Sequence, residues 1–147
     1  MKDVTTKLAE RVDALLLEAG LESDVSAGGF WSLRFGSTVL ILSVFEHEGR
    51  GYVRMAAVVL VGAQPTLDLL SRLLRLNNAV LFGSFQLFDD ATVAFTHTIP
   101  GDPLDFPTFD AALRYVARVG DDHDEELQAL AGGERAEDVL GEAPTSL

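Results

Sequence analysis

The chain has 147 residues and a net charge of −12, with 11 lysines and arginines against 23 aspartates and glutamates. Nucleic-acid binding takes its affinity from basic side chains that neutralise phosphates, so this charge argues against direct binding to DNA or RNA. The same negative field disfavours anionic membranes and favours a basic partner. The sequence contains no cysteine, which excludes disulfides, thiolate zinc sites and cysteine nucleophiles.

The start of the chain, MKDVTTKLAERV, lacks the apolar core of a signal peptide, and no apolar run is long enough to predict a transmembrane helix. We therefore expect a cytoplasmic protein with no membrane partner. The length is typical of a single domain that buries a self-sufficient core.

Apolar residues recur at helical spacing from Val4 to Ala19, with Asp3 as a candidate N-cap and Gly20 as a stop. Two tight turns follow, at Gly36–Ser37 and within Glu48–Gly51. They predict an antiparallel meander of three strands, over residues 29–35, 38–46 and 51–61.

In the second half, Pro65 introduces a leucine-rich helix that Asn77–Asn78 is expected to end. Strands over residues 81–88 and 92–99 form a second hairpin around Asp89–Asp90. A long amphipathic helix follows, with Asp102 or Asp105 as its cap. The predicted division is a single domain over residues 1–131 and a flexible acidic tail over residues 132–147.

The element order α-β-β-β-α-β-β-α predicts an α+β domain, an antiparallel sheet flanked by helices. The two central strands, 38–46 and 51–61, are apolar on both of their faces. A strand with one wet face should instead alternate between apolar and polar residues. We therefore expect the three helices to cover both faces of the sheet.

The leucines of the middle helix cover more of its circumference than one sheet contact needs. Burying a leucine is worth about 1.5–3 kcal/mol, so leaving several in water is unfavourable. One interpretation is a homodimer that buries this helix against a second copy, with the expected interface at Leu67, Leu69, Leu70, Leu73 and Leu76. The alternative is that the other helices of the same chain cover it.

No catalytic, cofactor or metal site is predicted. In GDDHDEEL, His123 continues the apolar stripe of the last helix, no second histidine lies four residues away, and the spacing does not fit a calcium loop. His97 lies on an apolar strand face, where a lone histidine is more often a packed residue than a base. The serines lie in no nucleophile elbow, and no phosphate-binding loop is present.

The stretch from Leu74 to Leu127 resembles the YbjN-like family, described as bacterial sensory-transduction regulators. The resemblance is carried by Leu76–Asn77, Phe82–Gly83–Ser84–Phe85, Asp89–Asp90, Ile99–Pro100, Leu104, Leu113, Val116, Asp121 and Asp124. The family is similar in fold to type III secretion chaperones. The resemblance implies a domain that commonly dimerises and binds polypeptide segments of partner proteins, and it brings no catalytic residues.

The function expected from the sequence is that of a non-enzymatic, chaperone- or adaptor-like homodimer that holds a segment of another protein. Apolar sheet and helix surfaces would supply affinity by groove docking or strand addition, and the acidic surface suits a basic segment. Aromatic residues are enriched at interface anchors, so Trp31, Tyr52, Phe85 and Phe88 are the expected contacts. The alternative is a small-ligand sensor, with a pocket between the sheet and the last helix and His97 or His123 as its polar group.

Overall fold

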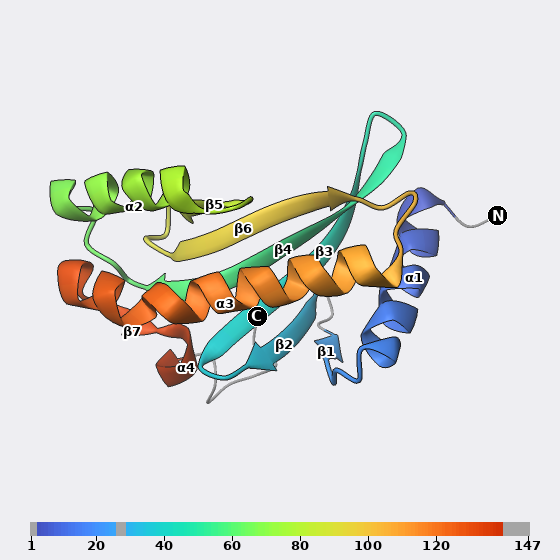
Figure 1. Cartoon of the computed structure of the whole chain (residues 1–147), viewed down its shortest axis with the longest axis horizontal. Helices are drawn as coiled ribbons and strands as arrows, with labels where there is room; N and C mark the ends of the chain where they lie inside the picture. Colours follow the sequence, from blue (N-terminus) through green and yellow to red (C-terminus); the bar gives the residue numbers. More distant parts are fainter. Residues whose placement is uncertain (1–2, 26–28, 140–147) are drawn as a thin grey trace.

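The structure is a computed structural model that describes residues 3–25 and 29–139. Figure 1 shows one antiparallel sheet with helices packed against it. In chain order the elements are α1 (Val4–Glu18), β1 (Asp24–Val25), β2 (Trp31–Phe35), β3 (Thr38–His47), β4 (Arg50–Val61), α2 (Leu67–Ala79), β5 (Ser84–Leu87), β6 (Val93–Pro100), α3 (Phe106–Ala131), β7 (Glu134–Arg135) and α4 (Ala136–Val139). The predicted α+β class and the order of its main elements are confirmed, and β1, β7 and α4 are additions that the sequence did not predict.

Turn chemistry sets the register of the meander. Gly36 opens the β2–β3 turn at φ +55, as a turn with glycine in its first central position requires, and Phe35 pairs with Thr38. Glu48 and Gly49 both have positive φ in the β3–β4 turn, where His47 pairs with Arg50. The two predicted reversals are therefore confirmed.

The sheet runs in the order β1-β2-β3-β4-β6-β5, and β7 pairs with the end of β4. The main core is formed between one face of this sheet and the apolar sides of α1, α2 and α3. Gly120, which is buried in α3, allows this helix to approach the sheet closely. A Cβ at this position would lie only 2.8 Å from the Cβ of Ala57 on β4. Asp105 caps α3 by accepting a hydrogen bond from the Thr108 N–H, which selects it over Asp102.

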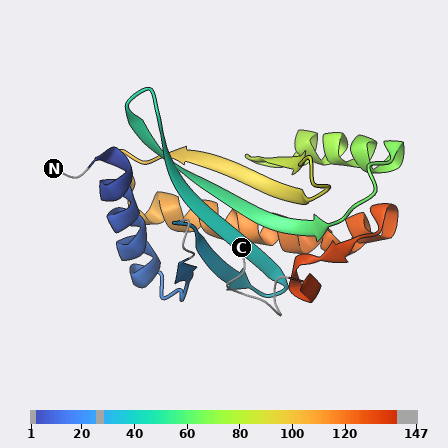
Figure 2. The ribbon, with the colours of Figure 1, turned by 180° about the vertical axis from the view of Figure 1, so that it is seen from behind.

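The opposite face of the sheet is seen in Figure 2, where the strands lie in front of α3. Among the described residues, α4 is the one helix that packs on this face, where Ala136 contacts a small cluster with Val39 and Val58. The expectation that three helices cover both faces of the sheet is wrong. All three bury their apolar sides in the same core, which leaves the second face of β3 and β4 largely uncovered.

The predicted stop of the middle helix is also corrected. Both asparagines lie inside α2, which ends at Ala79 and is followed by Val80 in an extended conformation. Neither has a positive φ, so no left-handed cap is used. Instead, the Asn77 side chain accepts a hydrogen bond from the Phe85 N–H at 2.6 Å and donates one to the Phe85 carbonyl at 3.2 Å. Asn77 thus satisfies the outer backbone groups of the edge strand β5, as a neighbouring strand would.

Residues 132–147 were expected to be a flexible tail, but residues 134–139 form β7 and α4. Residues 140–147 lie outside the described residues. In the part of the chain that the structure covers, no helix is both long and apolar enough to cross a membrane.

Replacing Asn77 with alanine should leave both backbone groups of Phe85 without their partners. An unsatisfied buried polar group destabilises by about 1–3 kcal/mol, so Asn77→Ala should lower the free energy of unfolding by that amount in urea titrations. Asn78→Ala is the matched control, because Asn78 is exposed and the change in helix propensity is the same. Equal effects of the two substitutions would contradict the bridging role of Asn77.

Candidate binding surface

The uncovered face of the sheet is apolar at its centre. Ile41 of β3, Ala56 and Val58 of β4 and Ala94 of β6 line a hollow of about 370 Å³ on this face. Phe30 and Phe88, exposed by 43% and 44%, lie at its rim, with Ser43, Arg54, Asp90 and Thr92 as further lining residues. A concave apolar surface with aromatic rims and few polar groups is typical of a binding site. We call this surface the open-face hollow.

Beyond the hollow, toward the β3–β4 hairpin tip, the same face carries a stacked group. Phe45 and Tyr52 are a cross-strand pair with ring centroids 5.6 Å apart. The Arg54 guanidinium lies 4.8 Å from the Phe45 ring centroid, and its Nε donates to Thr98 Oγ1 at 3.4 Å. These contacts hold Arg54, a cation in an acidic protein, at the edge of the open-face hollow.

The four aromatic residues expected at the interface divide into two pairs. Tyr52 and Phe88 lie on or beside the open face. Trp31 and Phe85 are buried in the main core at 3% and 4% exposure, and the Trp31 indole donates to Asp13 at 2.8 Å. The buried pair cannot reach a partner while the fold is intact, so of the four only Tyr52 and Phe88 remain candidates for contact with a partner.

Sequence reasoning missed the floor of the open-face hollow, although its signal was visible. Ile41 and Val58 belong to the strand faces that broke the apolar–polar alternation. We assigned those residues to helix contacts, and the structure places them where no large helix packs. A strand that is apolar on both faces can therefore mark a binding face as well as a buried one.

The leucines of α2 are divided between the core and solvent. Leu69, Leu73 and Leu76 face the core of their own chain at 0–5% exposure. Leu67 and Leu70, at 79% and 39%, point away from it. Leu74, at 71%, extends this outward stripe. Of the expected dimer residues, three are thus already covered within the chain, and an exposed stripe of Leu67, Leu70 and Leu74 remains on α2.

The predicted histidine candidates are packed residues. The His123 Nδ1 lies 2.5 Å from Glu126 Oε1, and Glu126 also accepts from Arg72 Nε at 3.1 Å, which joins α3 to α2. His97 packs on Phe82 with ring centroids 4.3 Å apart, and its burial lowers its pKa. No group of three or more potential metal ligands occurs among the described residues.

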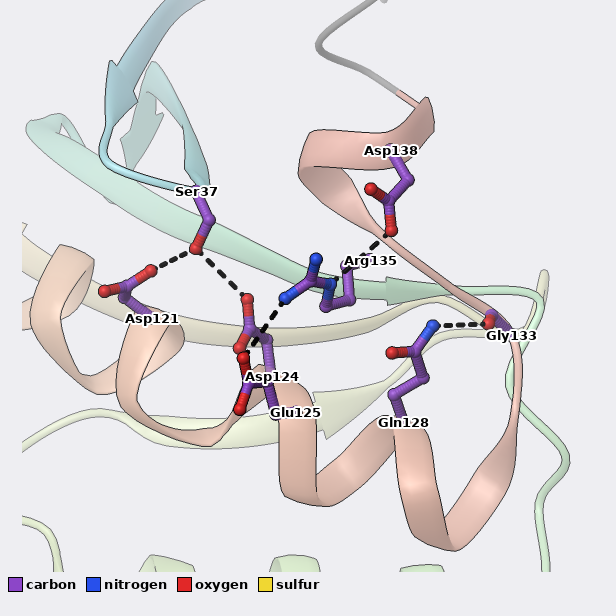
Figure 3. Close-up of polar contacts among 8 residues, drawn as sticks. All are labelled: Ser37, Asp121, Asp124, Glu125, Gln128, Gly133, Arg135 and Asp138. Atoms are coloured by element: carbon purple, nitrogen blue, oxygen red, sulfur yellow. Dashed lines mark hydrogen bonds and ion pairs between the residues drawn. The ribbon is translucent and has the colours of Figure 1, made fainter.

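Figure 3 shows a polar cluster that joins α3 to the β2–β3 turn and to the C-terminal segment. The Ser37 hydroxyl lies within hydrogen-bonding distance of Asp121, and 3.2 Å from Asp124 Oδ2. Arg135 Nη1 is 3.6 Å from Glu125, and its Nε is 3.5 Å from Asp138.

Asp124 is 6% exposed, and burial raises its pKa above the ordinary value of 3.8, while the Ser37 hydrogen bond and the charge of Arg135 act in the opposite direction. A raised pKa in the folded state means that the folded chain binds this proton more tightly than the unfolded chain. The contribution of Asp124 to stability is therefore largest at acid pH and is lost as pH rises from 3.8 through the raised folded pKa.

Comparing the wild type with Asp124→Asn tests whether Asp124 makes the protein less stable as pH rises. As pH rises from below 3.8 through the raised pKa, the wild type should lose stability relative to the variant, and the difference should then level off. Urea unfolding across that pH range gives both free energies. The Ser37 hydroxyl lowers the pKa of Asp124. Ser37→Ala should therefore extend this loss of stability to higher pH. A difference curve of opposite slope would contradict the assignment.

Comparison with known proteins identifies the family. Residues 6–139 match the family described as "T3SS (YopN, CesT) and YbjN peptide-binding chaperone 1". The chain belongs to this peptide-binding chaperone family. The match spans α1 to α4, so the resemblance seen in the second half of the sequence is confirmed and extends over almost the whole chain.

A solved structure supports the fold of this peptide-binding chaperone. One chain of the "Crystal Structure of the ExsC-ExsE Complex" matches with a TM-score of 0.66 and 18% sequence identity, over 86% of the present chain and 97% of that chain. At this identity the likeness shows the shared fold. A search of curated proteins by sequence found no match.

Proposed function

We propose that this protein is a non-enzymatic, cytoplasmic chaperone that holds an extended segment of a partner protein on the open face of its sheet. The observation that carries the proposal is the open-face hollow, an apolar surface with two half-exposed phenylalanines on a sheet face that the large helices leave uncovered. Membership of a peptide-binding family supports a polypeptide as the ligand.

The residues that line the hollow indicate which side chains the partner segment should carry. Phe30 and Phe88 at the rim and Ile41 and Val58 on the floor favour apolar side chains. The rim also carries one cation, Arg54, and one anion, Asp90. The net charge of −12 attracts a segment with basic residues and speeds its encounter with the surface. An apolar segment with flanking basic residues therefore fits best.

Blocking the floor of the hollow tests this location. Short peptides that bind the full chain would be selected from a random phage-displayed library, and their affinities measured by fluorescence polarisation. Ala56→Glu places a charge on the floor, so we expect at least about a tenfold loss of affinity, equivalent to about 1.4 kcal/mol. Ala14→Glu is the control, because it makes the same substitution at an exposed alanine of α1 that does not line the hollow.

Circular dichroism and thermal unfolding would show that both variants remain folded. Affinity that is unchanged in folded Ala56→Glu, or lost equally in both variants, would contradict binding at the hollow.

We further propose that the chaperone is a homodimer in which the exposed stripe of α2 meets the same stripe of a second copy. Leu67, Leu70 and Leu74 follow helical spacing on the side of α2 that faces away from the core. In a twofold-symmetric dimer the same surface patch of both subunits forms the interface, so this stripe would contact its copy on the second chain. The Arg72–Glu126 pair joins α2 to α3, while Leu69, Leu73 and Leu76 hold the other side of α2 in the core.

Leu74→Glu should convert the dimer into single chains of 15.8 kDa, measured by multi-angle light scattering across a dilution series. A buried unpaired charge at the twofold contact opposes association from both subunits. Leu17→Glu is the control, because Leu17 is similarly exposed, at 81%, but lies on α1. A monomeric wild type, or a Leu74→Glu variant that remains dimeric, would contradict this interface.

A further inference from the structure

The C-terminal segment, residues 132–139, itself binds the sheet as an added strand. The pairing of β3 with β4 reaches only Val39 and Val58, whereas β4 continues to Val61. β7 pairs with this end of β4 on the side that β3 does not reach, with Arg135 opposite Leu60 and Glu134 opposite Val61. This is strand addition within one chain, the geometry in which extended peptides commonly bind sheet edges.

The segment holds this edge from both sides of the sheet. Arg135 lies across from Leu60, a main-core residue, and its guanidinium reaches Glu125 on α3 at 3.6 Å. The charge of Arg135 also acts on the buried Asp124. The next residue, Ala136, points to the opposite face and is 1% exposed in its cluster with Val39 and Val58.

Ala136 lies next to the open-face hollow. Val58 and Ile41 line that hollow, and the same two residues belong to the small cluster around Ala136. This cluster is separate from the main core, so α4 can leave without opening the space between the sheet and α3. Its departure would expose Val39 and lengthen the hollow toward the edge of β4.

Two ion pairs of the segment lie at the protein surface. Arg135 pairs with Glu125 and Asp138, whose side chains are 85% and 47% exposed. Exposed ion pairs contribute about 0–1 kcal/mol each. The backbone reaches β7 through Gly133, which has a φ of +77. A Cβ at this position would lie 2.6 Å from the Val61 carbonyl oxygen, so the close approach to β4 requires glycine. The segment thus docks in one defined register, and these two surface ion pairs add little to its binding.

We propose that residues 132–139 are an intramolecular occupant of the peptide-binding surface, displaced by a partner segment that pairs with Leu60–Val61 and carries a basic residue followed directly by a small apolar residue. The partner's basic side chain replaces Arg135 beside Asp124 and Glu125, and its small residue replaces Ala136 on Val39 and Val58. This inference rests on the proposed function, because it extends the same surface. Self-occupancy lowers the apparent affinity of the intact chain by the fraction of time that the site is open.

The probe is a fluorescein-labelled peptide with the sequence of residues 132–139, Gly-Gly-Glu-Arg-Ala-Glu-Asp-Val. It is titrated into the full chain and into the full-length variant Ala136→Asp, which places a charge in the apolar cluster and expels α4. We expect the peptide to bind Ala136→Asp at least about tenfold more tightly than the wild type. The same peptide with Arg135→Glu should bind Ala136→Asp at least about tenfold more weakly than the original peptide.

Glu134→Gln is the control variant, because Glu134 is exposed and precedes the anchoring pair, and it should bind the probe like the wild type. Equal affinity of the probe for the wild type and folded Ala136→Asp, or no binding to either, would overturn the inference. If peptides selected for the open-face hollow still bind and still depend on Ala56, the proposed function stands while this inference fails.

Hydrogen exchange on the wild type decides the matter if Ala136→Asp does not fold. We expect the amides of residues 134–136 to exchange much faster than those in the β3–β4 pairing, because the segment opens without global unfolding. Protection equal to that of β3 and β4 would mean that the segment is an integral part of the fold and would overturn the inference.

Discussion

The close contact of α3 with the centre of the sheet is the constraint on which the rest of the structure depends. Gly120 lets the helix axis approach Ala57 so closely that a methyl group does not fit between them. The apolar stripes of α1 and α2 join the same core, so the helices gather on one face. An antiparallel sheet can remain folded with one face solvated, and here that second face keeps apolar residues at its centre. The proposed binding surface is therefore a direct consequence of one-sided packing.

Much of this fold was predictable because local chemistry determined it. Asp3 caps α1 through the Thr6 N–H, and Gly36 and Gly49 adopt the positive φ that their turns require. These interactions involve residues a few positions apart, so their sequence signatures are readable. The α+β class and the order of the main elements followed from them.

The parts that sequence reasoning missed depend on distant partners. Asn77 was read as a helix stop because asparagine tolerates left-handed conformations. In the structure its amide bonds the backbone of Phe85, and no local pattern shows such a contact. The C-terminal segment was read as a tail because it is polar and rich in glycine. Its strand pairing with Leu60 and Val61 appears only once β4 extends past β3.

The candidate site could be predicted only in part, because it too depends on contacts between residues far apart in the sequence. The excess of apolar residues on β3 and β4 was evident, but the sequence does not state whether a helix or a partner covers them. Trp31 and Phe85 were chosen as contacts by residue type, and burial places them in the core. Tyr52 and Phe88, chosen in the same way, lie on or beside the open face, because pleating turns alternate residues to opposite sides.

A single face of the sheet thus combines an apolar hollow, an aromatic rim and, beside the hollow, Ala136 of the docked C-terminal segment. Under the proposed function, the acidic surface outside the hollow speeds the encounter with basic partners without supplying much of the affinity itself.

The most direct measurement is an NMR experiment that detects nuclear Overhauser effects between a selected, unlabelled peptide and the methyl groups of the full-length, isotope-labelled chain. The account predicts cross-peaks from the peptide to the methyl groups of Ile41, Ala56, Val58 and Ala94. Cross-peaks confined to methyl groups of α1 or of the outer side of α2, with none to these four residues, would contradict it.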